Sequence, residues 1–308
     1  MLTSRAGLAK FLLVLLAYAA LSAAVPAVFS SYWTLVALNL AMWIALTQSW
    51  ALFSGMTGYV SLGHVVFYGI GAYVVASSFK VIPVWLSIPL GGLVAGLFAL
   101  IIAIPVLRVR GPYFVILTFG VAELIKFSIL NLETSIGKSS RLLFGAPATT
   151  SLLYTMIGLA VTASLLTYWV SQSRFGRGLR AIKEDEIAAE TIGVPVVFAK
   201  VLVFSVSAVI PGMVGGVMAL RSTYFEVLQV FDPTISFTVV SMAIIGGSGD
   251  ARGPLMGAAF MIVLSELLWT SAPRLYMILL GALLILFVIF VPSGMAGLLL
   301  RRAKGRTS

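Results

Sequence analysis

Apolar runs of about 20 residues recur along almost the whole sequence, and a helix of that length crosses a hydrocarbon core of about 30 Å. Hydrophobic residues make up 60% of the 308 positions and charged residues only 10%, whereas about 25% of the residues in soluble domains are charged. Little sequence remains for a separate soluble domain. The sequence therefore predicts an all-α polytopic membrane protein in which residues 1–308 form a single membrane-spanning domain.

Candidate spans follow one another closely along the chain. They cover residues 11–29, 34–53, 60–79, 84–107, 112–130, 152–171, 200–220, 236–247, 254–270 and 276–292. The segment 236–247 is too short to cross alone, and 60–79 and 254–270 begin with glycine-rich breaks. We expect about ten crossings, within a range of about eight to ten.

Basic residues indicate which loops face the cytoplasm, because lysine and arginine are enriched in cytoplasmic loops. The chain has 20 basic and 10 acidic residues, a net charge of +10. The basic groups that should share the cytoplasmic side are Arg5 and Lys10, Arg108 and Arg110, Arg174, Arg177, Arg180 and Lys183, and Arg301, Arg302, Lys304 and Arg306. An even number of crossings meets this requirement and places both termini in the cytoplasm. The excess charge then faces anionic lipid and does not indicate a nucleic-acid partner.

The N-terminal run "FLLVLLAYAALSAAVPAVF" follows Arg5 and Lys10 and has features of a signal peptide. Its apolar length of about 19 residues exceeds the roughly 7 to 15 residues of a signal-peptide core, and further spans follow at once. We therefore expect it to be a retained first span.

Two glycine-rich breaks interrupt the hydrophobic pattern, "SGMTGYVSLGH" at 54–64 and "IGGSGDARGP" at 245–254. They look like corresponding positions of two halves, which would indicate an internal repeat and a translocation path, because irregular backbone at membrane depth survives only against protein or a water-filled cavity. The alternative is a pair of tight turns between ordinary spans. The path candidates in these breaks are Gly55, Gly58, Ser61, Gly63, His64, Gly246, Gly247 and Gly249.

Charged residues inside predicted spans are candidates for function as well as for structure. Glu123 and Lys126 lie three positions apart, so on a helix they share a face and can pair. They form either a structural pair or part of the substrate path, since such residues usually face the bundle interior. Glu266 lies nearer a helix end, and we expect it to have a structural role. Asp250 and Arg252 are assigned to a turn.

A polar segment, "RFGRGLRAIKEDEIAAETIGV" at 174–194, stands between apolar spans. Residues 178–193 are predicted to form a short helix, with Gly193 in the left-handed position after its end and Pro195 beyond. A narrow stripe on this helix consists of Ala181, Ile182, Ala188, Ala189 and Ile192. Such a helix could lie in a groove of another protein, or it could pack on its own bundle or on lipid headgroups.

The stretch "GRGLRAIKEDEIAAETIGV" resembles the cytoplasmic coupling loop of ABC-importer permeases of the branched-chain amino acid family. "SGMTGYVSLGHVVFYGIGAYVVA" and "GGSGDARGPLMGA" are similar to the two glycine-rich signatures of that family, and "RVRGPYFVILTFGVAELIK" also fits. The resemblance covers residues 34–292. Met56 and Tyr59 stand where relatives often have glutamine or another polar residue, so the solute stays open between a branched-chain amino acid, urea, a short amide and another small solute.

The resemblance implies the shorter, M-type permease of a pair in the bacterial inner membrane. Its loop, at about 172–199, would dock on a separate ATPase through the residues that match the family's loop. These are Arg180, Ala181, Ile182, Ala188, Ala189 and Gly193. The implied partners are a second homologous permease, two cytoplasmic ATP-binding subunits and a periplasmic substrate-binding protein. The chain is not expected to hydrolyse ATP, because Leu132 stands where the first glycine of a phosphate loop ending in "SIGKSS" (135–140) would be.

Two other classes of membrane protein compete with this interpretation. An ion-coupled secondary transporter could use Glu123 to carry a proton, but it leaves the polar segment unexplained. An intramembrane serine protease could use "GGSG" at 246–249, yet the one histidine, His64, precedes Ser248 in the chain, whereas rhomboid proteases place theirs after the serine. With one histidine and no cysteine, no metal site or cofactor is expected.

Overall fold

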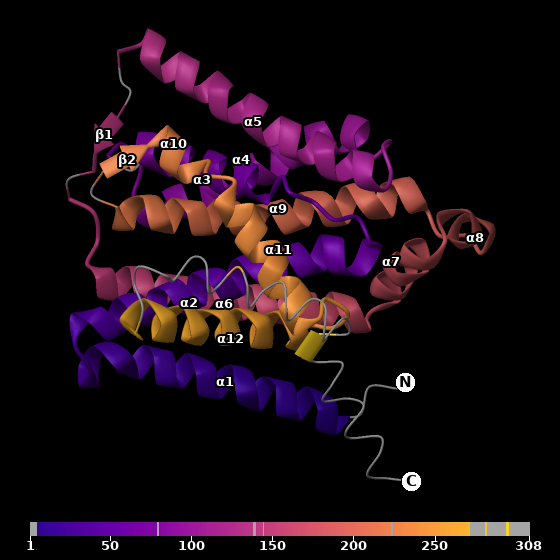
Figure 1. The fold of residues 1–308 in the computed structure, drawn as a ribbon, viewed down its shortest axis with the longest axis horizontal. Helices are drawn as coiled ribbons and strands as arrows, with labels where there is room; N and C mark the ends of the chain where they lie inside the picture. The colour runs from indigo at the N-terminus through magenta and orange to yellow at the C-terminus, as the bar shows by residue number, and fades with distance from the viewer. Residues whose placement is uncertain are drawn as a thin grey trace.

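Long apolar helices run back and forth between the two ends of the molecule (Figure 1). The computed structural model describes residues 5–78, 80–137, 140–143, 145–222, 224–271, 281 and 294–295. The long helices are α1 (Arg5–Val28), α2 (Ser31–Trp50), α3 (His64–Ser78), α4 (Val84–Val106), α5 (Pro112–Ser135), α6 (Thr149–Gln172), α9 (Val196–Arg221), α11 (Thr234–Gly246) and α12 (Arg252–Ser271). The predicted all-α polytopic membrane fold is confirmed by this arrangement.

Each predicted span up to 254–270 overlaps one of these helices, and the predicted span 276–292 lies outside the described residues. Within the described part of the chain, 7 stretches are long and apolar enough to cross a membrane. Helix α3 is apolar but has only 15 residues, because the glycine-rich break before it stays non-helical. A count of about ten crossings therefore stays a prediction.

Short elements occupy the two ends. Helices α7 (Arg174–Glu184) and α8 (Glu186–Thr191) lie at one end, which we call the α8 end. Strands β1 (Ser140–Leu142) and β2 (Tyr224–Glu226) and helix α10 (Val227–Val230) lie at the other, the strand end (Figure 1). The strands pair antiparallel, with Arg141 opposite Phe225, a small sheet that hydropathy did not predict. A π-helical turn, η1 (Ala51–Gly55), continues α2 into the first glycine break.

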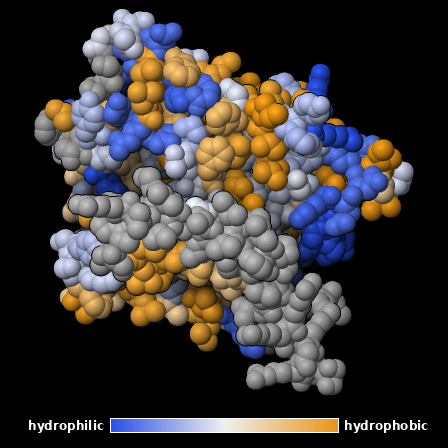
Figure 2. Space-filling view, in the orientation of Figure 1, coloured by the Kyte–Doolittle hydropathy of each residue, from blue (hydrophilic) through white to orange (hydrophobic). Residues whose placement is uncertain are grey.

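The basic groups near residues 10, 108–110 and 174–183 all lie at the α8 end, as the orientation argument requires of residues that share one side (Figure 1). The fourth basic group, 301–306, lies outside the described residues. Figure 2 shows hydrophilic residues gathered over α7 and α8 and hydrophobic residues over much of the neighbouring surface. Exposed apolar side chains on α1, α4 and α5, such as Leu13, Ile101 and Ile116, suit contact with lipid chains.

The central helices α3, α4 and α9 approach one another through small residues. A Cβ atom on Gly215 would overlap the backbone oxygen of Tyr68, and one on Gly71 would overlap that of Gly212. In a bilayer, where lipid chains are as apolar as leucine, such backbone proximity is a main source of helix association. Aromatic rings from three elements fill the space beside these contacts, with Phe53, Phe67 and Phe204 fully buried.

Gly215→Ala is expected to destabilise the protein by about 1 to 3 kcal/mol, because the added methyl group forces α9 away from α3. Gly158→Ala is the matched control, since a Cβ atom there meets nothing within 4 Å. At that position alanine should be neutral or slightly stabilising, by up to about 1 kcal/mol, because it favours the helix. Thermal unfolding in detergent measures both, and equal Tm values for the two variants would contradict the close approach of α3 and α9.

Candidate functional site

The two glycine breaks, far apart in the sequence, meet in the structure. A Cβ atom on Gly55 would overlap the backbone oxygen of Ser248, so only glycine fits there. The Gln48 side chain donates from Nε2 to the carbonyl of Ala251, with 2.6 Å between the atoms. The breaks therefore form one irregular region in which backbone polar groups are bonded within the protein, as membrane depth requires.

The other path candidates of the first break lie largely inside the bundle. His64 begins α3 and is buried, with its Nε2 atom 3.1 Å from Ser49 Oγ. That hydroxyl donates its proton to the carbonyl of Ser207 at 2.7 Å, so it accepts from His64. Ser61 is also buried, and its Oγ accepts from the Gly63 amide at 3.2 Å. These contacts hold the start of α3 against α2 and α9.

The path candidates of the second break have different surroundings. Gly246 ends α11 where a Cβ atom would overlap the Gly253 carbonyl, so it seals the contact between α11 and α12. The Gly247 amide donates to Ala243, and Gly249 has open space where a side chain would be. Asp250 lies in the predicted turn, but the assignment of Arg252 to that turn is wrong, because Arg252 is the first residue of α12.

The predicted pairing of Glu123 with Lys126 is present as an ion pair on α5. Lys126 also lies over the ring of Phe127, with 5.0 Å between Nζ and the ring centroid. Helix α5 forms an edge of the bundle (Figure 1), and its first half contacts the first glycine break, where Thr118 Oγ1 accepts from the Leu62 amide at 3.2 Å. A role for this pair along the substrate path stays a prediction. Glu266, the other acidic residue predicted to lie in a span, is part of α12.

The polar segment forms two helices, so the prediction of one helix over 178–193 is wrong. Asp185 interrupts the pattern with extended backbone angles, φ −158° and ψ 120°. Its Oδ1 atom accepts hydrogen bonds from the amides of Ile187 at 2.8 Å and Ala188 at 3.0 Å, a favoured N-cap for α8. The left-handed conformation predicted for Gly193 is present, with φ +84°. The Gly193 and Val194 amides bond back to Glu190 and Ala189, which completes a Schellman motif.

This break in the helix splits the predicted apolar stripe between two faces. Ile182 and Ala189 are buried in the chain's own core, and Ala181 is half-buried. Ala188 and Ile192 are exposed, and so is Ile187, which the stripe did not include. Arg180 donates from Nη2 to the Ser171 carbonyl at 2.6 Å, which ties α7 to the end of α6. The exposed apolar side chains of α8 and its C-terminal cap are therefore Ile187, Ala188 and Ile192.

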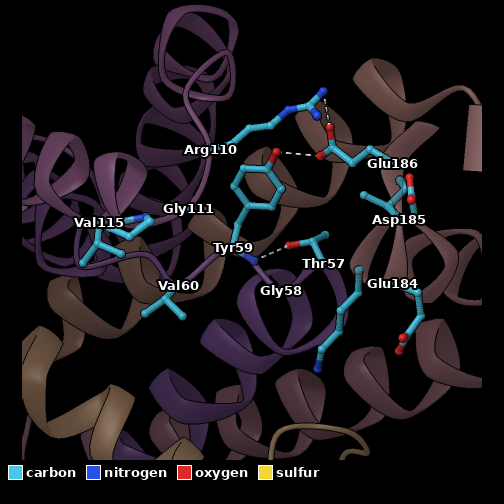
Figure 3. Close-up of a pocket in the computed structure, with 13 residues that line it drawn as sticks. Thr57, Gly58, Tyr59, Val60, Arg110, Gly111, Val115, Glu184, Asp185 and Glu186 are labelled. Carbon is cyan, nitrogen blue, oxygen red and sulfur yellow. Dashed lines mark hydrogen bonds and ion pairs between the residues drawn. The ribbon is translucent and has the colours of Figure 1, made fainter. Parts of the chain in front are cut away.

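On its inner side, α8 is joined to the bundle by a cluster of charges around Glu186 (Figure 3). Glu186 Oε1 accepts from the Tyr59 hydroxyl at 2.6 Å and from Lys200 Nζ at 2.8 Å. Its Oε2 atom forms an ion pair with Arg110 at 2.7 Å. The side chains of Lys200 and Glu186 are only 5% and 9% exposed, so this pair is largely desolvated, whereas the Arg110 side chain is 63% exposed. The cluster joins the first glycine break, the loop between α4 and α5, and α9.

A second contact joins the polar segment to the same break. Lys183 donates from Nζ to the Gly55 carbonyl at 3.1 Å, and a Cβ atom on Gly58 would lie 3.1 Å from the Lys183 side chain. Gly58 has φ +79°, a conformation that favours glycine. A pocket of about 530 Å³ opens beside these contacts, lined by residues 57–60, 110–112, 115 and 182–186 (Figure 3).

The environment keeps Glu186 ionised. Burial alone would raise the pKa of its carboxyl, but hydrogen bonds from Lys200 and Tyr59 and the charges of Lys200 and Arg110 outweigh burial and lower that pKa. Burial, together with the hydrogen bond to Glu186, raises the pKa of the Tyr59 hydroxyl, so this group stays neutral and donates. The cluster thus holds one carboxylate between two cations at neutral pH.

The model of the "branched-chain amino acid transport system / permease component" family matches residues 32–288. The chain belongs to this family. Among curated proteins, the permease is 28% identical over 275 residues to "high-affinity branched-chain amino acid transport system permease protein LivM" of Salmonella typhimurium. The LivM protein of Escherichia coli is 27% identical over the same length, and each match covers 78% of this chain. LivH of Salmonella typhimurium is 28% identical over 191 residues, which is 60% of this chain.

This permease covers 64% of the length of the LivM relatives and 59% of that of LivH. The LivM relatives are longer than this chain, so its length does not assign it to either member of the pair. The LivM match is nevertheless the more extensive. No solved structure matches the permease.

Sequence reasoning missed the Glu186 cluster. In the sequence, Arg110 indicates only orientation and Tyr59 only a departure from the family pattern, and neither predicts a contact with Glu186 or Lys200. One signal was available, because Lys200 lies at the start of an apolar span, where a charge needs a nearby partner. Which carboxylate it pairs with could not be inferred from spacing.

Glu186→Gln is expected to destabilise the permease by about 3 kcal/mol, because it leaves Lys200 buried without its counter-charge. Glu184→Gln is the matched control, since Glu184 is an exposed glutamate only two residues away, at the end of α7. The wild type should also lose stability progressively as pH falls through about 4.3, the pKa of an unfolded glutamate, because the unfolded state then takes up a proton that folded Glu186, with its lowered pKa, does not. Unfolding at pH 7 and pH 4 measures both effects. A wild type and Glu186→Gln variant with the same pH dependence would contradict the cluster.

Proposed function

We propose that this chain is a pore-forming permease that carries branched-chain amino acids across the bacterial inner membrane in an importer driven by separate ATP-binding subunits. The observation that carries this proposal is the position of α8. Its outer face is apolar and exposed, and its inner face is bonded through Glu186 to the first glycine break. A short helix with a free face and a buried anchor is suited to pass the movement of a docked partner into the bundle.

The route of that movement follows from the contacts. An ATP-binding subunit would dock on Ile187, Ala188 and Ile192. A displacement of α8 would pull Glu186, and through it Tyr59 of the glycine break and Lys200 of α9. The neighbouring Lys183 would move the Gly55 carbonyl, where the two glycine breaks touch. The whole route is only a few residues long, so little movement would be lost to side-chain rotation.

The same proposal defines the partners. The family relatives bear two names, LivM and LivH, which supports a second homologous permease beside this chain. A periplasmic substrate-binding protein would deliver the solute at the strand end, and two ATP-binding subunits would dock at the α8 end, with both termini cytoplasmic. The lipid-facing surfaces of α1, α4 and α5 would contact membrane lipid. The chain itself performs no covalent catalysis in this scheme.

A proton-coupled transporter is the competing mechanism. Such a transporter would use Glu123 to carry the proton, and this carboxylate is engaged in an ion pair with Lys126. The polar segment with its exposed apolar face also has no purpose in such a transporter.

Uptake of radiolabelled leucine separates these mechanisms. The chain would be reconstituted into proteoliposomes with the permease and ATP-binding subunits that copurify with it, and with its binding protein outside. ATP-dependent uptake that a protonophore leaves unchanged is expected. Competition by valine, but not by urea or short amides, would support a branched-chain amino acid as the solute. Uptake that needs no ATP and collapses with the protonophore would overturn the proposal.

Ala188→Glu is expected to reduce copurification of the ATP-binding subunits at least about tenfold, because it buries a charge in the docked face. Its Tm should stay unchanged, since Ala188 is exposed. Thr149→Glu is the control, an exposed position at the strand end. Ala189→Glu is not a fair probe, because Ala189 is 1% exposed and the change would disrupt the core. Undiminished copurification with Ala188→Glu would contradict docking on α8.

A further inference from the structure

A second cavity lies at the strand end, far from the α8 cluster. Its volume is about 350 Å³, and it is lined by residues of α2, α3, α9, β2, α10 and α11. This size falls within the range of about 300 to 1,000 Å³ that is typical of small-molecule sites. None of the residues discussed for the glycine breaks or for α8 contributes to it, so the cavity needs an explanation of its own.

The charge in this cavity is unbalanced. Arg221, the last residue of α9, is the one charged side chain among the described residues that line it, and no lining residue is acidic. Arg221 donates from Nη1 to Asn39 Oδ1 at 3.5 Å, a long and weak hydrogen bond. A guanidinium has five N–H donors in a planar fork that fits a carboxylate with two parallel hydrogen bonds. The chemistry of the cavity therefore favours an anion with two oxygen atoms.

The other walls of the cavity combine apolar side chains with polar ones such as Ser222 and Gln229. Met42 and Trp43 line it from α2, Phe225 from β2 and Ile235 from α11. Phe225 is fully buried, so this wall is part of the packed core. Apolar side chains in the same cavity as a single cation suit a small molecule with a carboxylate at one end and a hydrocarbon group at the other.

We infer that this cavity binds the carboxylate of a small apolar amino acid on Arg221 and its aliphatic side chain against the Met42, Trp43 and Ile235 wall. The assignment of this ligand as the transported solute rests on the proposed function, whereas binding itself does not. The ammonium group of the ligand faces only neutral acceptors, such as the side-chain amides of Asn39 and Gln229. The carboxylate, not the ammonium group, is therefore the main determinant of recognition.

This chemistry makes a selectivity test possible. Binding of tritiated leucine to the full chain in lipid nanodiscs would be measured, with competition by two analogues. 4-Methylpentanoate keeps the carboxylate and the side chain but lacks the ammonium group, and should compete within about tenfold of leucine. Leucinamide keeps the ammonium group but lacks the carboxylate, and should compete at least about tenfold more weakly than leucine, the effect of one charge-assisted hydrogen bond.

Two variants test the cavity itself. Arg221→Gln should weaken leucine binding at least about tenfold. Lys80→Gln is the matched control, since it removes one positive charge from an exposed site at the same end without contacting the cavity. Gln229→Trp should block the cavity from its rim, because Gln229 is exposed and the larger side chain does not disturb the core. Unfolding curves for each variant separate a loss of binding from a loss of fold.

Each outcome decides the inference. Saturable leucine binding that falls with Arg221→Gln and Gln229→Trp, but not with Lys80→Gln, supports it. The inference is overturned if the wild type binds no leucine, if leucinamide competes as well as leucine, or if a folded Arg221→Gln variant binds normally. ATP-driven leucine uptake that Arg221→Gln leaves unchanged would remove this site and keep the proposed function. Leucine binding at this site without ATP-driven uptake would keep this site and remove the proposed function.

Discussion

Backbone polar groups within a membrane must be hydrogen-bonded inside the protein, and the rest of the structure depends on this requirement. It holds whatever the side chains are. Helices meet this requirement by themselves, but the two glycine breaks do not. At the breaks, side chains bond backbone carbonyls, as when Gln48 donates to Ala251 and Trp50 donates to Ser61, and the two breaks pack against each other at Gly55 and Ser248. The junction is therefore stable only while both breaks stay in place, which couples the two halves of the chain.

The charged side chains around Glu186 are subject to a similar requirement, because a charge removed from water must be paired. Glu186 and Lys200 are nearly removed from solvent, and moving such charges out of water costs several kcal/mol each unless they are paired. Two cations and a tyrosine hydroxyl around one carboxylate meet that condition. The cost of separating them means that α8, the glycine break and α9 tend to move as one unit. Such a unit is suited to transmit movement, whereas independent side chains would absorb it.

Much of the fold could be predicted because it follows from local pattern. Hydropathy located the helices, glycine spacing located the breaks, and the three-residue spacing of Glu123 and Lys126 predicted their pairing. The division of α7 from α8 was missed, because the apolar period continued through Asp185 while its side chain capped a new helix. The Glu186 cluster and the β1–β2 sheet join residues far apart in the sequence, and no local pattern encodes such partners. The burial of Ala189 on the inner face of α8 was missed for the same reason, because no local pattern shows which distant residues cover it.

The short helix α8 also has a constraint on its length. Asp185 caps the helix, Glu186 anchors it in the bundle and Ile187 lies on the free face, so three consecutive residues have three different environments. Each residue of an α-helix is rotated by about 100° from the one before it. Deleting one residue before Glu186 would turn Ile187 toward the charges, and inserting one there would turn Glu186 toward the free face. This loop should therefore accept many substitutions on its surface but almost no change in its number of residues, although polar loops usually vary in length.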